Sequence, residues 1–314
     1  MSSNKRSTGT IPLRDRGRLL ISVGGEGLSF SAAFSPGGAI LAFLFVCGAF
    51  LALLAAAPVG AQTGGPGADP CRVFTCDQGG IIRGDVSSKR MALIFTGGSF
   101  ADGGEHIRAV LKTKGIRAGF FFTGDFYRTP EFQELIRELA ADGHYLGPHS
   151  DRHLLYCDWN DRAKTLVTRD EFRRDLLANY REMERLGIPK ARAAYFIPPY
   201  EWYNTEIVGW AREMGVVLFN FTPGTSSNAD YTTPSMMEYL SSEKIYGRIL
   251  AYEKKDLQGL NGFILLIHIG TDPERTDKLY LRLEDLVTEL ESRGYSFARI
   301  DELLTFFSET RRGS

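Results

Sequence analysis

Residues 91–123, MALIFTGGSFADGGEHIRAVLKTKGIRAGFFFT, decide the fold class. Met91–Phe95 is a short apolar run that breaks at two glycines, as a buried strand does. Glu105–Lys114 has the pattern of a helix, and Gly115 after it suits a left-handed cap. Ala118–Thr123 is a second apolar run and contains three consecutive phenylalanines. Strand, helix and strand in this order predict an α/β fold with parallel strands.

The same alternation continues toward the C-terminus. Further helices are expected over 130–142, after the capping box Thr168–Glu171, and over 205–214 and 279–293. Further strands are expected near 194–197, 216–219 and 263–267. We therefore expect one domain over roughly residues 80–310, with its site at the carboxyl ends of the strands.

Composition excludes some classes of function. The chain has 314 residues, 43% of them hydrophobic, and a formal net charge of −1. A hydrophobic fraction of this size supports a real core. A nearly neutral chain has no global field that favours nucleic acid or an anionic membrane surface. We expect no nucleic-acid partner.

The N-terminal part has the pattern of an export signal. Ala39–Ala57 is an uncharged apolar run of 19 residues that follows two basic clusters. Val59 and Ala61 suit a signal-peptidase site with cleavage before Gln62. Residues 1–61 are thus predicted to be a signal peptide or an uncleaved anchor, and 62–90 a linker or extension. The expected location is periplasmic or extracellular, with membrane contact only through an uncleaved N-terminal segment.

Cysteine usage agrees with export. Cys71 and Cys76 are separated by four residues in a Gly/Pro-rich segment and are predicted either to close a small disulfide loop or to stay unpaired. Cys157 is then the odd residue, expected as a buried free thiol.

A histidine motif is the strongest sign of chemistry. His149-Ser150-Asp151-Arg152-His153 follows Gly143-His144, and the chain holds only five histidines. Two imidazoles four positions apart can converge on one metal ion if the segment makes a helical turn, although a metal site needs more than two ligands.

The segments, in this order, resemble the polysaccharide deacetylase family, the carbohydrate esterases of family four, from about Met91 to Leu304. The resemblance implies a distorted, incomplete (β/α) barrel, with a catalytic domain at 91–310. The matching motifs are Ser99–Gly103 for Thr-Phe-Asp-Asp-Gly, His149–His153 for His-Ser-x-x-His, Pro198-Pro199-Tyr200, Asp230-Tyr231 and Leu266-Ile267-His268.

The resemblance also implies roles. Asp102, His149 and His153 take the metal-ligand positions, with zinc as the first expectation and cobalt, nickel or iron as alternatives. Tyr200 is expected to give its backbone N–H to the oxyanion. His268 is expected to be the general acid, oriented by Asp230.

Two family positions differ in this chain. Ala101 stands at the position of the catalytic base, and Ile197 at that of its arginine partner. Both charges are absent together, as expected if one buried charge cannot remain alone. Glu201 is the first substitute base and Asp151 the second. Alternatively, metal-bound hydroxide suffices and His268 serves both roles.

The remaining histidines and loop aromatics have milder expectations. His144 is expected to be structural rather than a fourth ligand, and His106 to be exposed. Among the aromatic residues near the motifs, Trp202 and Tyr203 are expected to stack on sugar rings.

The sequence thus predicts a secreted, metal-dependent hydrolase that removes acyl groups, N-acetyl rather than O-acetyl, from a polysaccharide or peptidoglycan. The alternative is a metal-binding, carbohydrate-binding pseudoenzyme that has lost turnover together with its base.

Overall fold

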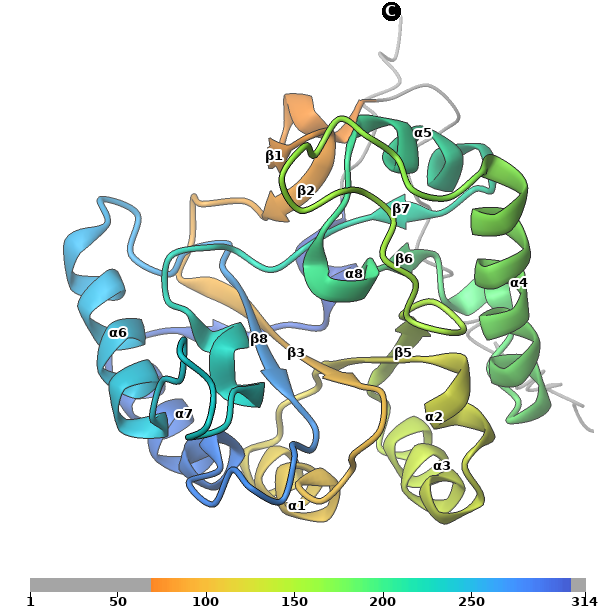
Figure 1. Ribbon diagram of the computed structural model, residues 1–314. Helices are drawn as coiled ribbons and strands as arrows, with labels where there is room; N and C mark the ends of the chain where they lie inside the picture. The colour runs from red at the N-terminus through yellow and green to blue at the C-terminus, as the bar shows by residue number, and fades with distance from the viewer. Residues whose placement is uncertain (1–68, 306–314) are drawn as a thin grey trace, which may run out of the picture. The chain divides into compact units, whose positions relative to one another are not determined.

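The computed structural model describes residues 69–305. Its centre is a parallel sheet in the order β5-β4-β3-β8 (Figure 1). The strands are β3 (Arg90–Gly97), β4 (Gly119–Phe122), β5 (Tyr145–Pro148) and β8 (Ile264–His268). Thr96 pairs with His268, and Phe122 pairs with both Gly97 and Pro148. The carboxyl ends of all four strands therefore meet at one edge.

Smaller strand pairs extend this arrangement. β6 (Tyr195–Phe196) and β7 (Val217–Leu218) are parallel, and β9 (Ser296–Phe297) pairs with the start of β3. A hairpin of β1 (Thr75–Asp77) and β2 (Gly80–Arg83) joins β7 through a parallel bridge between Ile81 and Phe219. Among the described residues the strands form separate sheets and no closed barrel. The α/β prediction, with an incomplete barrel, is confirmed.

Two apolar layers follow from the period-two alternation of the strands. On β3, Leu93 and Phe95 face the helices, whereas Ala92 and Ile94 face the interior of the incomplete barrel. Phe121 on β4 also faces the interior, where it packs on Phe219. The run of three phenylalanines thus fills both layers, which explains why it reads as a continuous apolar segment.

All but the last of the helices cover the outer layer, and the last packs against the interior layer. The five helices predicted from the sequence are present, together with three that were not predicted. They are α1 (Gly104–Lys114), α2 (Gly124–Arg128), α3 (Gln133–Ala141), α4 (Arg169–Arg185), α5 (Thr205–Glu213), α6 (Ser242–Lys255), α7 (Leu283–Ser292) and α8 (Ile300–Leu303). Short 3-10 turns occupy 70–72, 130–132, 190–192, 199–201, 227–231 and 279–282. The predicted capping box at Thr168 forms, and Gly115 adopts the left-handed conformation.

The cysteines and the predicted export segment have different outcomes, because the described residues begin at residue 69. Cys71 and Cys76 form a disulfide with a Cα–Cα distance of 5.5 Å, and Cys157 is a buried free thiol, as predicted. The proposed signal peptide or anchor lies outside the described residues. Between residues 69 and 305 no helix combines the length and hydropathy needed to cross a bilayer.

Candidate functional site

A cavity of about 770 Å³ opens at the carboxyl ends of β3 and β8. Five of the residues singled out from the sequence line it: His149, His153, Tyr200, Glu201 and His268. Asp230 lies directly behind His268, to which it is hydrogen-bonded. The structure thus brings six of the seven predicted site residues to one place. Asp102 is the exception.

The two histidines of the motif face each other. Their Nε2 atoms are 3.2 Å apart, and His149 Nδ1 lies 2.9 Å from the carbonyl oxygen of Ile197. Because that carbonyl only accepts, His149 carries its proton on Nδ1 and presents a lone pair at Nε2. Burial, then the nearby charge of His153, lowers the pKa of His149, and burial lowers the pKa of His153 to about 4. Both imidazoles are therefore neutral at pH 7.

A buried carboxylate, rather than a helical turn, shapes this motif. Ser150 and His153 adopt positive φ angles of 71° and 53°. Asp175 of α4 accepts hydrogen bonds from the Ser150 hydroxyl and from the backbone N–H groups of Asp151 and Arg152. Helix α4 thereby fixes a non-helical turn that still lets the two imidazoles converge.

Glu201 is an unusual carboxylate. It and Tyr200 adopt left-handed φ angles of 52° and 58°, a conformation that is costly for residues with a side chain. The strained turn directs Glu201 inward: its side chain is only 11% exposed, and Oε1 lies 3.9 Å from His149 Nε2. Burial raises the pKa of Glu201 to about 7, with an opposing contribution from His268. The group can therefore gain or lose a proton near neutral pH.

His268 and Asp230 form a hydrogen-bonded pair. His268 Nδ1 lies 2.6 Å from Asp230 Oδ1, and Asp230 is fully buried. Burial alone would lower the pKa of His268, but the charge of Asp230, the hydrogen bond to it and the charge of Glu201 more than offset this, so the pKa is raised. With Nδ1 held by Asp230, Nε2 is the nitrogen left for the cavity.

Asp102 does not lie in the cavity, and the predicted ligand set needs correction. Its Oδ2 accepts from the Tyr280 hydroxyl at 2.6 Å and pairs with Lys278 Nζ at 3.1 Å. Its Oδ1 accepts from the backbone N–H of Thr271 at 2.9 Å. An ammonium group and two further donors thus hold the carboxylate on the loop that follows β8. Asp102 joins this loop to the start of α1 instead of meeting the two histidines.

The residues that do end β3 beside the cavity are Thr96 and Gly97. Thr96 is buried opposite His268, and its hydroxyl has no hydrogen-bond partner among residues 69–305. This segment was not among the site residues predicted from the sequence. The signal was available, because Phe95 and Gly98 have the same spacing as Phe100 and Gly103.

The two apolar replacements do not meet. Ala101 packs against the outer core, whereas Ile197 belongs to the interior layer. An apolar contact between Ala101 and Ile197 therefore does not take the place of an ion pair. Thr96, not Ala101, is the neutral residue that faces the interior beside His268.

The donors do not fit the predicted metal. The resemblance stated from the sequence implies a divalent metal at this site. Within the part of the chain that the structure describes, no group of three or more His, Cys, Asp or Glu side chains is arranged to hold one. The histidine pair supplies two ligands, but the carboxylate assigned to complete the set is paired with Lys278. Asp102, His149 and His153 do not form a metal centre here.

The structure also tests the predictions made for four other residues near the motifs. Asp151 Oδ1 is paired with Arg128 at 2.6 Å, so its carboxylate is not available as a substitute base. His144 is buried and accepts a hydrogen bond from the Ala118 N–H, which makes it structural, as expected. His106 has a buried Nε2, against the expectation that it is exposed. Tyr203 is buried, with its hydroxyl bonded to Asp77 O, so it cannot stack on a sugar.

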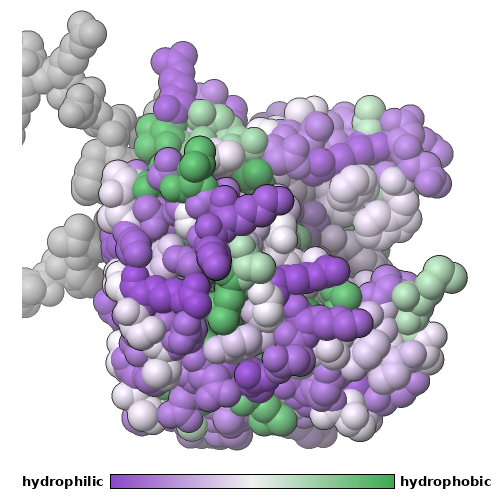
Figure 2. All heavy atoms as spheres, turned by 90° about the vertical axis from the view of Figure 1, so that its left-hand side faces the viewer, coloured by the Kyte–Doolittle hydropathy of each residue, from purple (hydrophilic) through white to green (hydrophobic). Residues whose placement is uncertain are grey.

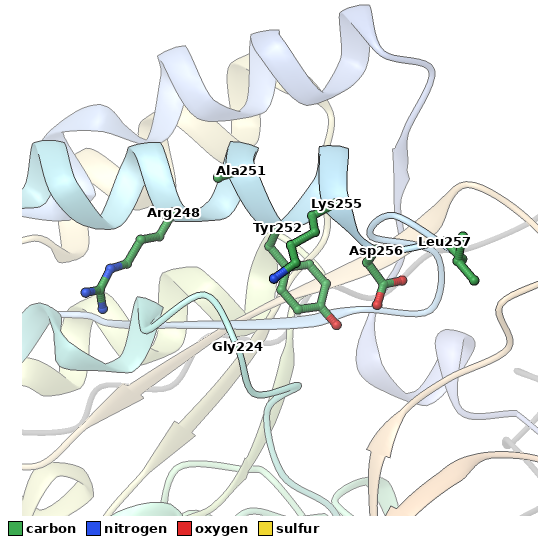
Figure 3. A pocket seen from close by; sticks show the side chains of 7 residues that line it. All are labelled: Gly224, Arg248, Ala251, Tyr252, Lys255, Asp256 and Leu257. Atoms are coloured by element: carbon green, nitrogen blue, oxygen red, sulfur yellow. The ribbon is translucent and has the colours of Figure 1, made fainter.

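A second hollow, of about 650 Å³, lies along α6 (Figure 3). Arg248 and Lys255 line it on either side of Tyr252. Its one carboxylate, Asp256, is paired with Arg83 at 3.4 Å. The face seen in Figure 2 is mostly hydrophilic, with separate hydrophobic patches. This hollow offers no acid–base pair comparable to that of the first cavity.

Comparison with known proteins connects this geometry to a family. Residues 83–219 match the family model described as polysaccharide deacetylase. The chain carries a polysaccharide deacetylase domain. The sequence resemblance is thereby confirmed.

Curated relatives of the deacetylase domain are distant. One is the uncharacterized protein YlxY of Bacillus subtilis, 26% identical over 66% of this chain and 54% of the relative. The chain thus spans about half the length of that protein. Another is the peptidoglycan-N-acetylmuramic acid deacetylase PdaA of the same organism, 23% identical over 70% of this chain and 73% of the relative.

Solved structures agree on the fold of the deacetylase domain. A pseudoenzyme of carbohydrate esterase family 4 from Bacillus anthracis superposes with a TM-score of 0.55, at 20% identity over 74% of this chain and 71% of the other. Bacillus subtilis PdaA gives a TM-score of 0.55, at 21% identity over 72% and 84%. A fold shared by an esterase and a pseudoenzyme leaves activity to be argued from the site.

Proposed function

We propose that the protein is an exported deacetylase that removes acyl groups, N-acetyl rather than O-acetyl, from a polysaccharide or peptidoglycan. One observation carries the proposal: a buried carboxylate with a pKa of about 7, Glu201, faces the same cavity as the His268–Asp230 pair. Two titratable groups in different protonation states at one site are what acid–base hydrolysis needs.

The chain's own groups can carry each proton. Glu201 takes a proton from the attacking water, whose oxygen bonds to the acyl carbon. The backbone N–H of Tyr200 donates to the resulting oxyanion, since none of the described residues accepts from it. His268 Nε2 then donates to the leaving amine as the C–N bond breaks, which gives acetate and a free amino sugar. Asp230 holds the His268 ring in place during this transfer.

The other parts of the proposal come from the sequence. Residues 1–61 direct export, 62–90 connect, and 91–310 form the catalytic domain. Zinc was the first expectation for a cofactor, but the predicted donors do not form its site. The steps above are therefore assigned only to groups of the chain itself.

A second function is favoured by the end of β3. Thr96 and Gly97 form the strand end that opens into the cavity, and neither carries a carboxylate. If the cleft above Thr96 and Gly97 binds a glycan but does not release its acyl group, the protein is a carbohydrate-binding protein.

Release of acetate separates the two functions. The full chain is incubated with acetylated chitooligosaccharide, acetylated xylan and peptidoglycan, with and without added Zn²⁺ or Co²⁺. The deacetylase proposal expects release from at least one substrate, and expects His268→Ala to abolish release while glycan binding persists. Glycan binding with no release from any substrate would favour the binding protein.

A further inference from the structure

An exposed indole stands at the mouth of the cavity. Trp159 lines the cavity beside Tyr200, and the two rings meet edge to face with centroids 5.6 Å apart. Trp159 is 54% exposed, although it is a large apolar side chain. Its other neighbour, Trp202, stacks against it at 5.7 Å with an interplanar angle of 26°. The indole is therefore held in one orientation while much of its surface stays open to solvent.

The neighbour that holds Trp159 is itself fixed by polar contacts. The Trp202 indole N–H donates to the carbonyl oxygen of Asp158 at 3.1 Å. The Arg162 guanidinium lies over the Trp202 ring, 4.4 Å from its centroid. Arg162 Nε in turn donates to the carbonyl oxygen of Tyr203 at 2.6 Å. Stacking and cation–π contacts of this kind restrict an aromatic side chain at little entropic cost.

The last support comes from the hairpin of β1 and β2, whose first strand is joined by the Cys71–Cys76 disulfide to the turn before it. Asp77, at the end of β1, accepts from Arg162 Nη1 at 2.7 Å. The backbone carbonyl of Asp77 accepts from the Tyr203 hydroxyl at 3.0 Å. Asp77 precedes residue 83, where the match to the family model begins. A segment outside that match thus supports the aromatic residues beside the cavity.

We propose that Trp159 is a stacking platform for a pyranose ring of the bound glycan, one sugar unit away from the unit whose acyl group enters the cavity. Asp77, Arg162 and Trp202 hold the platform in place. The inference rests on the proposed function, because it requires a glycan in the cavity. The apolar C–H face of a pyranose matches an indole face, and rigid aromatic side chains give up little freedom on binding. This role replaces the one expected for Tyr203.

The dependence of affinity on chain length tests the platform. Dissociation constants are measured by calorimetry for N-acetylated chitooligosaccharides of increasing length, with the full chain and its variants. The wild type is expected to gain about fivefold to tenfold in affinity when the chain becomes long enough to reach Trp159. Trp159→Ala should lose this gain, and Trp159→Phe should recover part of it.

The hairpin has a matched pair of variants. Asp77→Asn removes the charge that holds Arg162 and should weaken binding of the longer oligosaccharides. The control is Asp69→Asn, because Asp69 lies just before the disulfide-bonded Cys71 and caps only the turn at 70–72, so binding should be unchanged.

Failure of the platform and failure of the function give different results. If Trp159→Ala keeps the length-dependent gain, the platform is overturned, while acetate release still supports the deacetylase. If the wild type neither binds glycan of any length nor releases acetate, both proposals are overturned.

Discussion

Asp230 accepts two hydrogen bonds from a single residue, His268. Oδ1 accepts from the ring Nδ1 at 2.6 Å, and Oδ2 accepts from the backbone N–H at 2.9 Å. The carboxylate therefore fixes both the position of the strand end and the orientation of the ring. Because Asp230 is fully buried, water screens its charge little, and the charge acts strongly on the adjacent His268.

Replacing this charge should change the pH dependence of the reaction. In the wild type the pKa of His268 is raised, since the charge of Asp230 outweighs the effect of burial. Asp230→Asn removes the charge, so the pKa of His268 falls and the proton donor is lost at lower pH. We expect the descending limb of the rate profile to shift to lower pH and kcat to fall about 10- to 100-fold.

Acetate release measured as a function of pH checks this prediction. Asp272→Asn is the control, because Asp272 lines the cavity but its carboxylate bonds to the Glu274 backbone rather than to His268. A descending limb that does not move in Asp230→Asn would show that His268 is not the donor.

The protonation of Glu201 should determine the ascending limb of the pH–rate profile. Its pKa is raised to about 7 by burial, so the basic form becomes available only as the pH passes through that value. Glu201→Gln cannot accept a proton, and we expect kcat to fall about 10²- to 10⁴-fold, with the ascending limb lost and KM nearly unchanged. Steady-state kinetics over pH 5–9 provide the measurement. A variant that keeps an ascending limb near pH 7 would transfer the role of proton acceptor to another group.

Local patterns predicted the fold well where a signal lies in adjacent residues. The capping box at Thr168 and the left-handed Gly115 set helix limits directly, because each acts on a single turn. Helix α6 was missed, because Ser241 caps it through a single hydroxyl and few apolar residues lie on its buried face. The strand β5 was missed as well, because two of its four residues, Gly147 and Pro148, are of types that are depleted in strands.

The site was harder to predict where it depends on contacts distant in sequence. Asp102 has the right residue type and follows a Phe, but Lys278 and Tyr280 reach it from 176 and 178 positions away. The competing segment, Phe95–Gly98, has the same spacing. Only the register of β3 against β8 places Thr96 opposite His268.

Asp102 should therefore contribute to stability rather than to metal binding. Asp102→Ala removes the acceptor for Tyr280, Lys278 and Thr271. Its side chain is 42% exposed, so solvent screens part of this loss, and we expect the free energy of unfolding to fall by about 1–3 kcal/mol. Urea unfolding measures the change, and zinc content after equilibrium dialysis should equal that of the wild type. Loss of bound zinc at unchanged stability would restore Asp102 as a ligand.

The buried His144 should make the stability of the folded protein sensitive to acid. Burial, with smaller opposing and reinforcing effects from charged neighbours, lowers the pKa of His144 to about 4. Its Nδ1 accepts from the Ala118 N–H, and its Nε2 has no partner among the described residues. In the unfolded chain the same group titrates near its ordinary pKa of 6.5. Between these two pH values the unfolded state binds more protons, so stability rises with pH and is lost on acidification.

The free energy of unfolding that is lost in this way between pH 7 and pH 5 is about 2 kcal/mol. His144→Gln keeps a side-chain oxygen that can accept from Ala118 but has no titrating ring. We expect the variant to be less stable than the wild type at pH 7, because its shape fits the site less well. At pH 5 the gap should narrow by about 2 kcal/mol, as measured by urea unfolding at both pH values. The other buried histidines titrate equally in both proteins, so a gap that stays constant would mean that the pKa of His144 is the same in the folded and unfolded states.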